Sequence, residues 1–269
     1  MDMPVDAWRQ AALARHSRRT LDQRPIEPSV LDKLEAVCSA DGWGSLEWGH
    51  ATRVAIVREL RTNIFKGIVG AYGRIEGAPS CLLFIGDRTM PHTPELLGYA
   101  GEAIILEATR LGLATCWVGG FFKREKAADL LELGPNEEIM AVSPLGYPAD
   151  GLTFSEKLLK SMAGSHKRRE PAELAPGYSE TAWPAWAREA VALARVAPSA
   201  VNRQPWRFRL EDGALVLSLD ELKDTHHIPK RLDCGISMLH VEVGARAHGA
   251  PGSWQLLDGT DVARYTVRA

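Results

Sequence analysis

Apolar positions recur at helical spacing in several stretches of the chain, and other apolar runs are short enough for strands. The spacing predicts helices over 5–14, 28–37, 58–69, 94–111, 123–131, 187–196 and 236–247. The short runs predict strands over 53–57, 81–85, 115–118, 138–144 and 206–210. The chain is therefore expected to mix helices and strands along its length.

The stretch 94–111 gives the longest predicted helix, and apolar residues cover most of its circumference. A helix that is apolar nearly all round is buried at the centre of a protein. Gly112 ends this stretch, and the predicted strand 115–118 follows it. We therefore expect 94–111 to be the central helix of the fold.

Composition indicates an ordinary globular protein and excludes some partners. The 269 residues are 45% hydrophobic and 25% charged, with a net charge of −2. This charge gives no bulk attraction for nucleic acid or an anionic membrane. No apolar run approaches the roughly 20 residues of a membrane span, and the N-terminal residues do not resemble a secretory signal. We expect a cytoplasmic protein that binds neither nucleic acid nor membrane.

The cysteines and histidines do not indicate a metal site. The four cysteines stand far apart without a Cys-x-x-Cys pair, so they are expected to be reduced thiols, mostly in the core. His226 and His227 are adjacent, and neighbouring side chains on an extended segment point apart. No spaced set of His, Cys and Asp accompanies them, and no metal is expected.

A proline-bounded loop follows the predicted helix 187–196. Pro198 and Pro205 lack a backbone donor and bias the preceding residues to extended geometry. The segment between them is therefore a shaped loop that carries Ser199, Asn202 and Gln204. Such loops often contact ligands. The alternative is a helix-to-strand connection whose polar groups satisfy only their own turn.

This loop resembles a known flavin-binding motif. Pro198-Ser199-Ala200-x-Asn202-x-Gln204-Pro205-Trp206 is similar to the flavin-contacting loop of the FMN-dependent nitroreductase family. The resemblance implies that Pro198, Ser199, Ala200, Asn202 and Gln204 bind FMN. In that family the loop lies near the N-terminus, whereas here it lies near the C-terminus.

A second motif of the same family stands where the family has it. Arg15-His16-Ser17-Arg18-Arg19 resembles the opening Arg-x-Ser-x-Arg/Lys motif, in which the first Arg and the Ser bind the FMN phosphate and ribityl chain. The resemblance gives those roles to Arg15 and Ser17, places Arg19 near the pyrimidine edge, and includes His16 in the site. A planar guanidinium suits phosphate because it donates two parallel hydrogen bonds. A solvated basic helix end is the alternative.

Weaker parallels complete the expected site. Arg74 stands where relatives often carry a cation near the pyrimidine ring, although a surface arginine would look the same. Gly119 and Gly120 match the turn whose backbone amides point at flavin N5, or they form a tight turn alone. Lys167 and Arg169 resemble the late Lys-x-Arg cluster of the phosphate site, or belong to a solvated charge run.

The displaced loop suggests an internal duplication. Residues 1–175 resemble one nitroreductase subunit without the flavin loop, and 176–269 resemble a second, shortened copy that contains it. Three landmark pairs share one offset, since 235−98, 249−112 and 254−117 all equal 137; they are Gly98 and Gly235, Gly112 and Gly249, and Trp117 and Trp254. The Pro- and Gly-rich stretch 172–184 is expected to be the linker. This organisation is similar to a single-chain, Thermotoga-type branch of the family.

The resemblance implies a fold and a stoichiometry. The family fold is α+β, with a central, mainly antiparallel sheet and flanking helices. Its members are homodimers whose two FMN sites are built from both chains at the interface. A chain that carries one motif in each half would form a pseudo-dimer with one complete FMN site. A monomer is therefore expected, with further association possible.

The implied activity is FMN-dependent NAD(P)H oxidation. NADH or NADPH would pass hydride to flavin N5 and leave, and a nitroaromatic, quinone or similar acceptor would follow in a ping-pong cycle. FMN carries the chemistry, so no catalytic side chain is expected. The alternatives are a non-catalytic flavin-binding or sensor protein, a changed reaction such as dehalogenation or flavin breakdown, and a structural protein without flavin.

Overall fold

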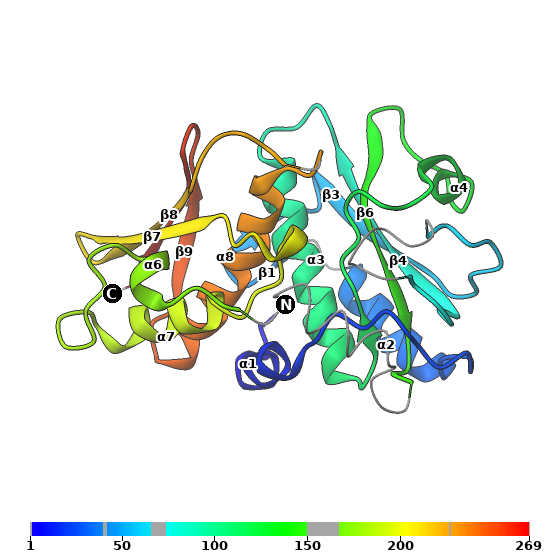
Figure 1. Cartoon of the computed structure of the whole chain (residues 1–269), viewed down its shortest axis with the longest axis horizontal. Coiled ribbons are helices and arrows are strands. Elements are labelled where there is room, and N and C mark those ends of the chain that lie inside the picture. Colours follow the sequence, from blue (N-terminus) through cyan, green and yellow to red (C-terminus); the bar gives the residue numbers. More distant parts are fainter. Residues whose placement is uncertain (1, 40–41, 66–73, 150–166, 226, 269) are drawn as a thin grey trace.

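Two antiparallel sheets lie on either side of a central helix pair (Figure 1). The computed structural model describes residues 2–39, 42–65, 74–149, 167–225 and 227–268. The central helices are α3 (Thr93–Arg110) and α8 (Lys230–Ala247). Both bury residues on most of their circumference, as predicted for the stretch 94–111.

The first sheet has the strand order β3-β4-β6-β5. Its strands are β3 (Thr52–Val57), β4 (Ser80–Asp87), β5 (Ala114–Thr115) and β6 (Glu137–Gly146). Successive side chains of β4 point to opposite faces, so Leu82 and Phe84 join the main core while Leu83 and Ile85 join a second, smaller core. A short hairpin of β1 (Gly42–Trp43) and β2 (Leu46–Glu47) stands apart from this sheet.

The second sheet has the order β7-β8-β10-β9. Its strands are β7 (Trp206–Glu211), β8 (Ala214–Leu219), β9 (Gly252–Leu256) and β10 (Asp261–Val267). In both sheets the chain order of neighbouring strands is first, second, fourth, third, with an 18-residue helix between the second and the third. The starts and the ends of these two helices are separated by the same number, since 230−93 and 247−110 both equal 137.

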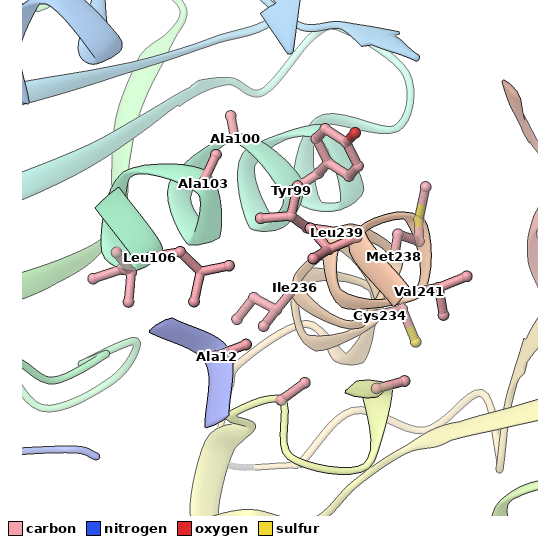
Figure 2. Close-up of a cluster of buried hydrophobic side chains, with 14 of the residues drawn as sticks. Ala12, Tyr99, Ala100, Ala103, Leu106, Cys234, Ile236, Met238, Leu239 and Val241 are labelled. Carbon is pink, nitrogen blue, oxygen red and sulfur yellow. The ribbon is translucent and has the colours of Figure 1, made fainter. Parts of the chain in front are cut away.

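Two glycines let α3 and α8 approach closely. A Cβ atom on Gly98 would lie 2.1 Å from the carbonyl oxygen of Leu232, and one on Gly235 would lie 2.0 Å from that of Glu95. Either contact is far shorter than van der Waals distance, so only glycine fits. Around this crossing the helices share one buried cluster, in which Figure 2 shows Tyr99 of α3 and Leu239 of α8.

The other helices within the described ranges lie outside the central pair (Figure 1). They are α1 (Val5–Ala14), α2 (Pro28–Cys38), α4 (Arg124–Ala128), α6 (Pro171–Leu174), α7 (Ala185–Ala194) and a 3₁₀ turn (Ala200–Asn202). Trp8 fixes α1 to α3, because its buried indole Nε1 donates to Glu107 Oε2 at 3.0 Å. No helix within the described ranges is long and apolar enough to cross a membrane.

The predicted helix over 58–69 is wrong for residues 58–65, and its last four residues lie outside the described ranges. The segment is irregular, with bends at 58–59 and 62, and Phe65 forms an isolated antiparallel bridge with Phe122. The Asn63 side chain accepts the Phe65 amide at 3.0 Å, a local bond that competes with helix formation. The apolar residues of this segment pack into the second core without forming a helix.

Other expectations are corrected in detail. The described residues form two four-stranded sheets with helices between them, besides the short hairpin, where one central sheet was expected. The predicted helix 123–131 is reduced to α4, and the predicted strand 115–118 to Ala114–Thr115 followed by an isolated bridge of Val118. The expected linker 172–184 contains most of α6 and buries Leu174 and Trp183, so it is part of the core.

Candidate functional site

The loop between α7 and β7 has an unusual backbone. Val201, Asn202 and Gln204 have φ angles of 48°, 56° and 48°, in the left-handed region. Asn tolerates this region, whereas a β-branched residue such as Val does so at a cost of about 1–3 kcal/mol. Backbone strain of this kind persists only where neighbouring groups hold the loop, and it concentrates at functional sites.

Arg168 holds one side of the loop. Its Nη1 donates to the Ala197 carbonyl and to Asn202 Oδ1, both at 2.9 Å, and its Nη2 donates to the Val196 carbonyl at 3.1 Å. The Asn202 amide in turn donates to the Lys167 carbonyl at 3.1 Å. The segment Lys167–Arg169 therefore lies directly against the predicted flavin loop.

Gln204 completes this contact. Its Oε1 accepts the Arg169 amide at 2.8 Å, and its Nε2 donates to the Lys167 carbonyl at 3.1 Å. Its own backbone amide donates to Ser199 Oγ at 3.0 Å across the loop. Gln204 is buried, so these bonds replace the water that its amide would otherwise bind.

Asp233 of α8 holds the other side of the loop. Its carboxylate accepts the Ala200 amide at 3.1 Å and Arg203 Nε at 2.6 Å. Arg203 also donates to the carbonyls of Thr225 and Ile228, at 3.2 and 3.0 Å. Burial raises the pKa of Asp233 to about 6, against the opposing effect of the Arg203 cation.

Arg15 is a buried cation at the end of α1. Only 7% of the residue is exposed, and its Nη1 donates to Ser17 Oγ at 3.4 Å. Its Nε has no hydrogen-bond partner, and Glu102 Oε1 lies 3.9 Å away. Ser17 is exposed and bridges Thr115 of β5 in parallel, which places this motif at the edge of the first sheet.

Positive charge gathers between these segments. Burial lowers the pKa of Arg168 to about 10, and the neighbouring Arg15 and Arg195 cations act in the same direction. Arg195 has its own partner, Glu170, at 2.9 Å. A buried guanidinium nitrogen without a hydrogen-bond partner, beside the half-buried guanidinium of Arg168, suits an oxyanion. The donor set thus fits the phosphate of FMN.

Some of the other predicted residues lie near the loop or near Arg15. Gly119 is close to the loop region, because a Cβ there would lie 3.2 Å from Ile228, whose carbonyl Arg203 binds. Gly120 follows it and is half-buried, and Pro198 is buried at the start of the loop. Lys167 is exposed and contributes its carbonyl to the contacts of the loop, while His16 is exposed beside Arg15.

Arg19 and Arg74 lie along a different segment. The Arg19 carbonyl accepts the Glu76 amide at 2.9 Å, and Glu76 Oε1 lies 3.8 Å from Arg74 Nε. Arg74 is exposed, on the wall of a surface pocket of about 540 Å³ that residues 60–63 and 74–79 help to line. Arg74 is therefore connected through Glu76 to the segment around Arg19, not to Arg15 or the loop.

Sequence reasoning missed two parts of this region. Arg168 stands between two basic residues, and nothing in the sequence indicates which of the three points inward. The other part is a pair formed by Glu102 and His240, which are fully buried on α3 and α8. The signal for it was a carboxylate within the most apolar stretch of the chain. Among the described residues no three His, Cys, Asp or Glu side chains could hold a metal ion.

The chain is similar to known proteins in sequence and in fold. The profile of a family described as "Putative TM nitroreductase" matches residues 9–245. A crystal structure of a "putative nitroreductase" from Thermotoga maritima superposes with a TM-score of 0.60 at 21% identity, over 97% of this chain and 94% of that one. This likeness establishes a shared fold. No curated protein matches the chain.

Smaller structures match only part of the chain. A nitroreductase family protein from Clostridium novyi has a TM-score of 0.43 at 20% identity, over 53% of this chain and 86% of that one. A nitroreductase with bound FMN from Bacteroides fragilis has a TM-score of 0.40 at 18% identity, over 54% and 89%. Since the family profile spans most of the sequence, the chain, with its α+β nitroreductase-like fold, belongs to the family described as "Putative TM nitroreductase".

Proposed function

We propose that the protein is an FMN-dependent oxidoreductase of nitroreductase type. Its electron donor would be NADH or NADPH, and its acceptor a nitroaromatic, quinone or similar compound in a ping-pong cycle. Membership of the nitroreductase family supports this function. The observation that carries it is the buried Arg15, whose Nε lacks a partner, beside Arg168 and the strained loop.

The side chains of the site would bind and orient the cofactor. FMN, when bound, would supply the hydride chemistry. Arg15, Ser17 and the segment Lys167–Arg169 would hold its phosphate, through charge-assisted hydrogen bonds. Arg19 would place a cation near the pyrimidine edge, where negative charge develops on reduction. Asn202 and the loop amides would fix the ring, with Gly119 and Gly120 allowing close approach.

We further propose that the chain is an internal duplication, with residues 1–175 and 176–269 as its halves. The equal strand orders of the two sheets and the 137-residue offset between α3 and α8 support it. The glycine contacts are also reciprocal: Gly98 faces Leu232 and Gly235 faces Glu95, and 232−95 again equals 137. The monomer would then be a pseudo-dimer with one FMN site, since the Arg15 motif and the flavin loop each occur once.

Steady-state turnover tests the activity. The proposal expects NADH or NADPH oxidation that depends on both FMN and an acceptor such as a quinone, and a large loss of it in Arg15→Ala. Arg61→Ala is the matched control, because Arg61 is exposed and its side chain pairs with Glu59. Bound FMN without turnover on any acceptor would favour a flavin-binding or sensor protein instead.

A further inference from the structure

A buried carboxylate–imidazole pair joins α3 to α8 behind Arg15. Glu102 and His240 are both 0% exposed, and His240 Nε2 lies 3.0 Å from Glu102 Oε1. The other carboxylate oxygen accepts Trp117 Nε1 at 2.7 Å. Arg15 Nε lies 3.9 Å from the same Oε1 that faces His240. The proposed cofactor contacts make no use of this pair.

The hydrogen bonds of His240 fix how many protons the pair holds. Its Nδ1 lies 3.1 Å from the Leu193 carbonyl oxygen, which can only accept, so Nδ1 carries a proton. Its Nε2 faces a carboxylate oxygen, and a hydrogen bond there needs a second proton on one of the two atoms. Imidazolium with carboxylate and imidazole with carboxylic acid both satisfy this, and both leave the pair with no net charge.

The net charge of the Glu102–His240 pair decides how much positive charge the neighbouring arginines can offer to a ligand. The cations near Glu102 are Arg15, at the end of α1, and Arg168, from the segment before α6; Arg195, just after α7, acts on Arg168. Arg195 is paired with Glu170. An ionised Glu102 beside a neutral ring would cancel one of the two other cations. With the pair neutral, Arg15 and Arg168 together offer two positive charges.

We propose that the proton shared by Glu102 and His240 keeps Arg15 free to bind a dianionic group, which makes His240 a positioning residue of the anion site. Where that group is the FMN phosphate, the inference rests on the proposed function. The pair itself does not touch the ligand, since both of its members are enclosed by protein. Without the His240 imidazole, the Glu102 carboxylate would lose the shared proton, and its negative charge would pair with Arg15.

Substitution of the pair tests this through binding. The readouts are the dissociation constant for FMN and the thermal shift produced by sulfate, a dianion whose charge stays fixed at about pH 5 to 8. His240→Gln can still donate to Glu102 but brings no ionisable proton. It is expected to weaken FMN binding about tenfold at about pH 8, the effect of one nearby charge. Met238→Leu, buried on the same helix, is the control.

Two more variants separate charge from packing. In Glu102→Gln, an uncharged glutamine faces a neutral imidazole, so the pair still has no net charge. The affinity of this variant for FMN is therefore expected to stay within about twofold of wild type. Adding Glu102→Gln to His240→Gln is expected to restore the lost affinity.

Three results would overturn the proposal. One is unchanged affinity of His240→Gln for both probes, another is tighter binding by Glu102→Gln, and the third is a loss that the double variant does not restore. If the wild type binds no FMN but sulfate gives the expected pattern, the anion site stands and the proposed flavin function fails. If the wild type responds to neither probe, both fail.

Discussion

Val201 illustrates at the scale of one residue how the candidate site differs from the rest of the chain. Its φ of 48° is unfavourable for a β-branched side chain, and the neighbouring contacts from Arg168 and Asp233 hold the loop in this form. The sequence predicted that the loop is shaped by its two prolines. It could not predict the left-handed angles, because Val is among the residues least expected there.

Replacing Val201 by Asn should stabilise the protein. Asn adopts left-handed angles readily, so the substitution is expected to raise the free energy of unfolding by about 1 kcal/mol, or the melting temperature by about 2–4 °C. Val201→Thr keeps the β-branch and should give no gain. Thermal unfolding of the two variants beside wild type measures the difference. Equal melting temperatures for Asn and Thr would show that the angle stores no strain.

Asp233 should make stability depend on pH in a defined direction. Its pKa of about 6 in the fold lies above the ordinary value of an aspartic acid, about 3.9. The folded state therefore binds the proton more tightly, so this contribution is complete below about pH 4 and is lost as the pH rises through about 6. Over that pH range, the contribution of Asp233 to the free energy of unfolding falls by roughly 3 kcal/mol.

Urea unfolding between about pH 4 and 8 tests this, with Asp233→Asn compared with wild type. The asparagine variant should lack the fall in stability, so the difference between the two proteins should change across the window. Asp212→Asn, at an exposed turn, is the control and should run parallel to wild type. If the stability of Asp233→Asn changed with pH in the same way as that of wild type, the raised pKa of Asp233 would be contradicted.

At the scale of elements, periodicity predicted some helices closely and failed where distant contacts set the conformation. The predicted helix 5–14 matches α1 (Val5–Ala14), and 94–111 differs from α3 by one residue at each end. Both have strong apolar faces. Residues 58–65 have helical spacing too, yet a local Asn63 bond and the bridge to Phe122 hold them in an irregular, non-helical form. Such long-range pairing leaves no local signal.

The crossing of α3 and α8 gives a direct prediction for Gly235. A methyl group there would lie 2.0 Å from the Glu95 carbonyl oxygen, which is backbone and cannot move aside cheaply. Gly235→Ala is expected to lower the free energy of unfolding by about 3 kcal/mol or more. Gly134→Ala is the control, because the nearest atom to its added Cβ lies 3.5 Å away. Chemical unfolding of both variants measures the costs, and equal stability would contradict the close approach.

At the scale of the whole molecule, the two motifs that resemble family motifs lie on either side of one contact region. Residues 15–19 and 167–169 come from the first proposed half, and the loop comes from the second; Arg168 lies against the loop, and Arg15 lies near Arg168. The sequence suggested that the two motifs come from different halves, but it did not indicate which side chains join them. Arg168, Asp233 and the Glu102–His240 pair are long-range partners, and their pairing depends on the fold of both halves.

The central claim is that these segments form one FMN site per chain. Heat-released flavin, quantified per chain in the purified protein supplied with FMN, tests it most directly. The account predicts about one FMN per chain, greatly reduced in Arg15→Ala and in Asn202→Ala and retained in the exposed control Arg61→Ala. Two FMN per chain would contradict the single composite site, and no FMN at all would contradict the flavin function.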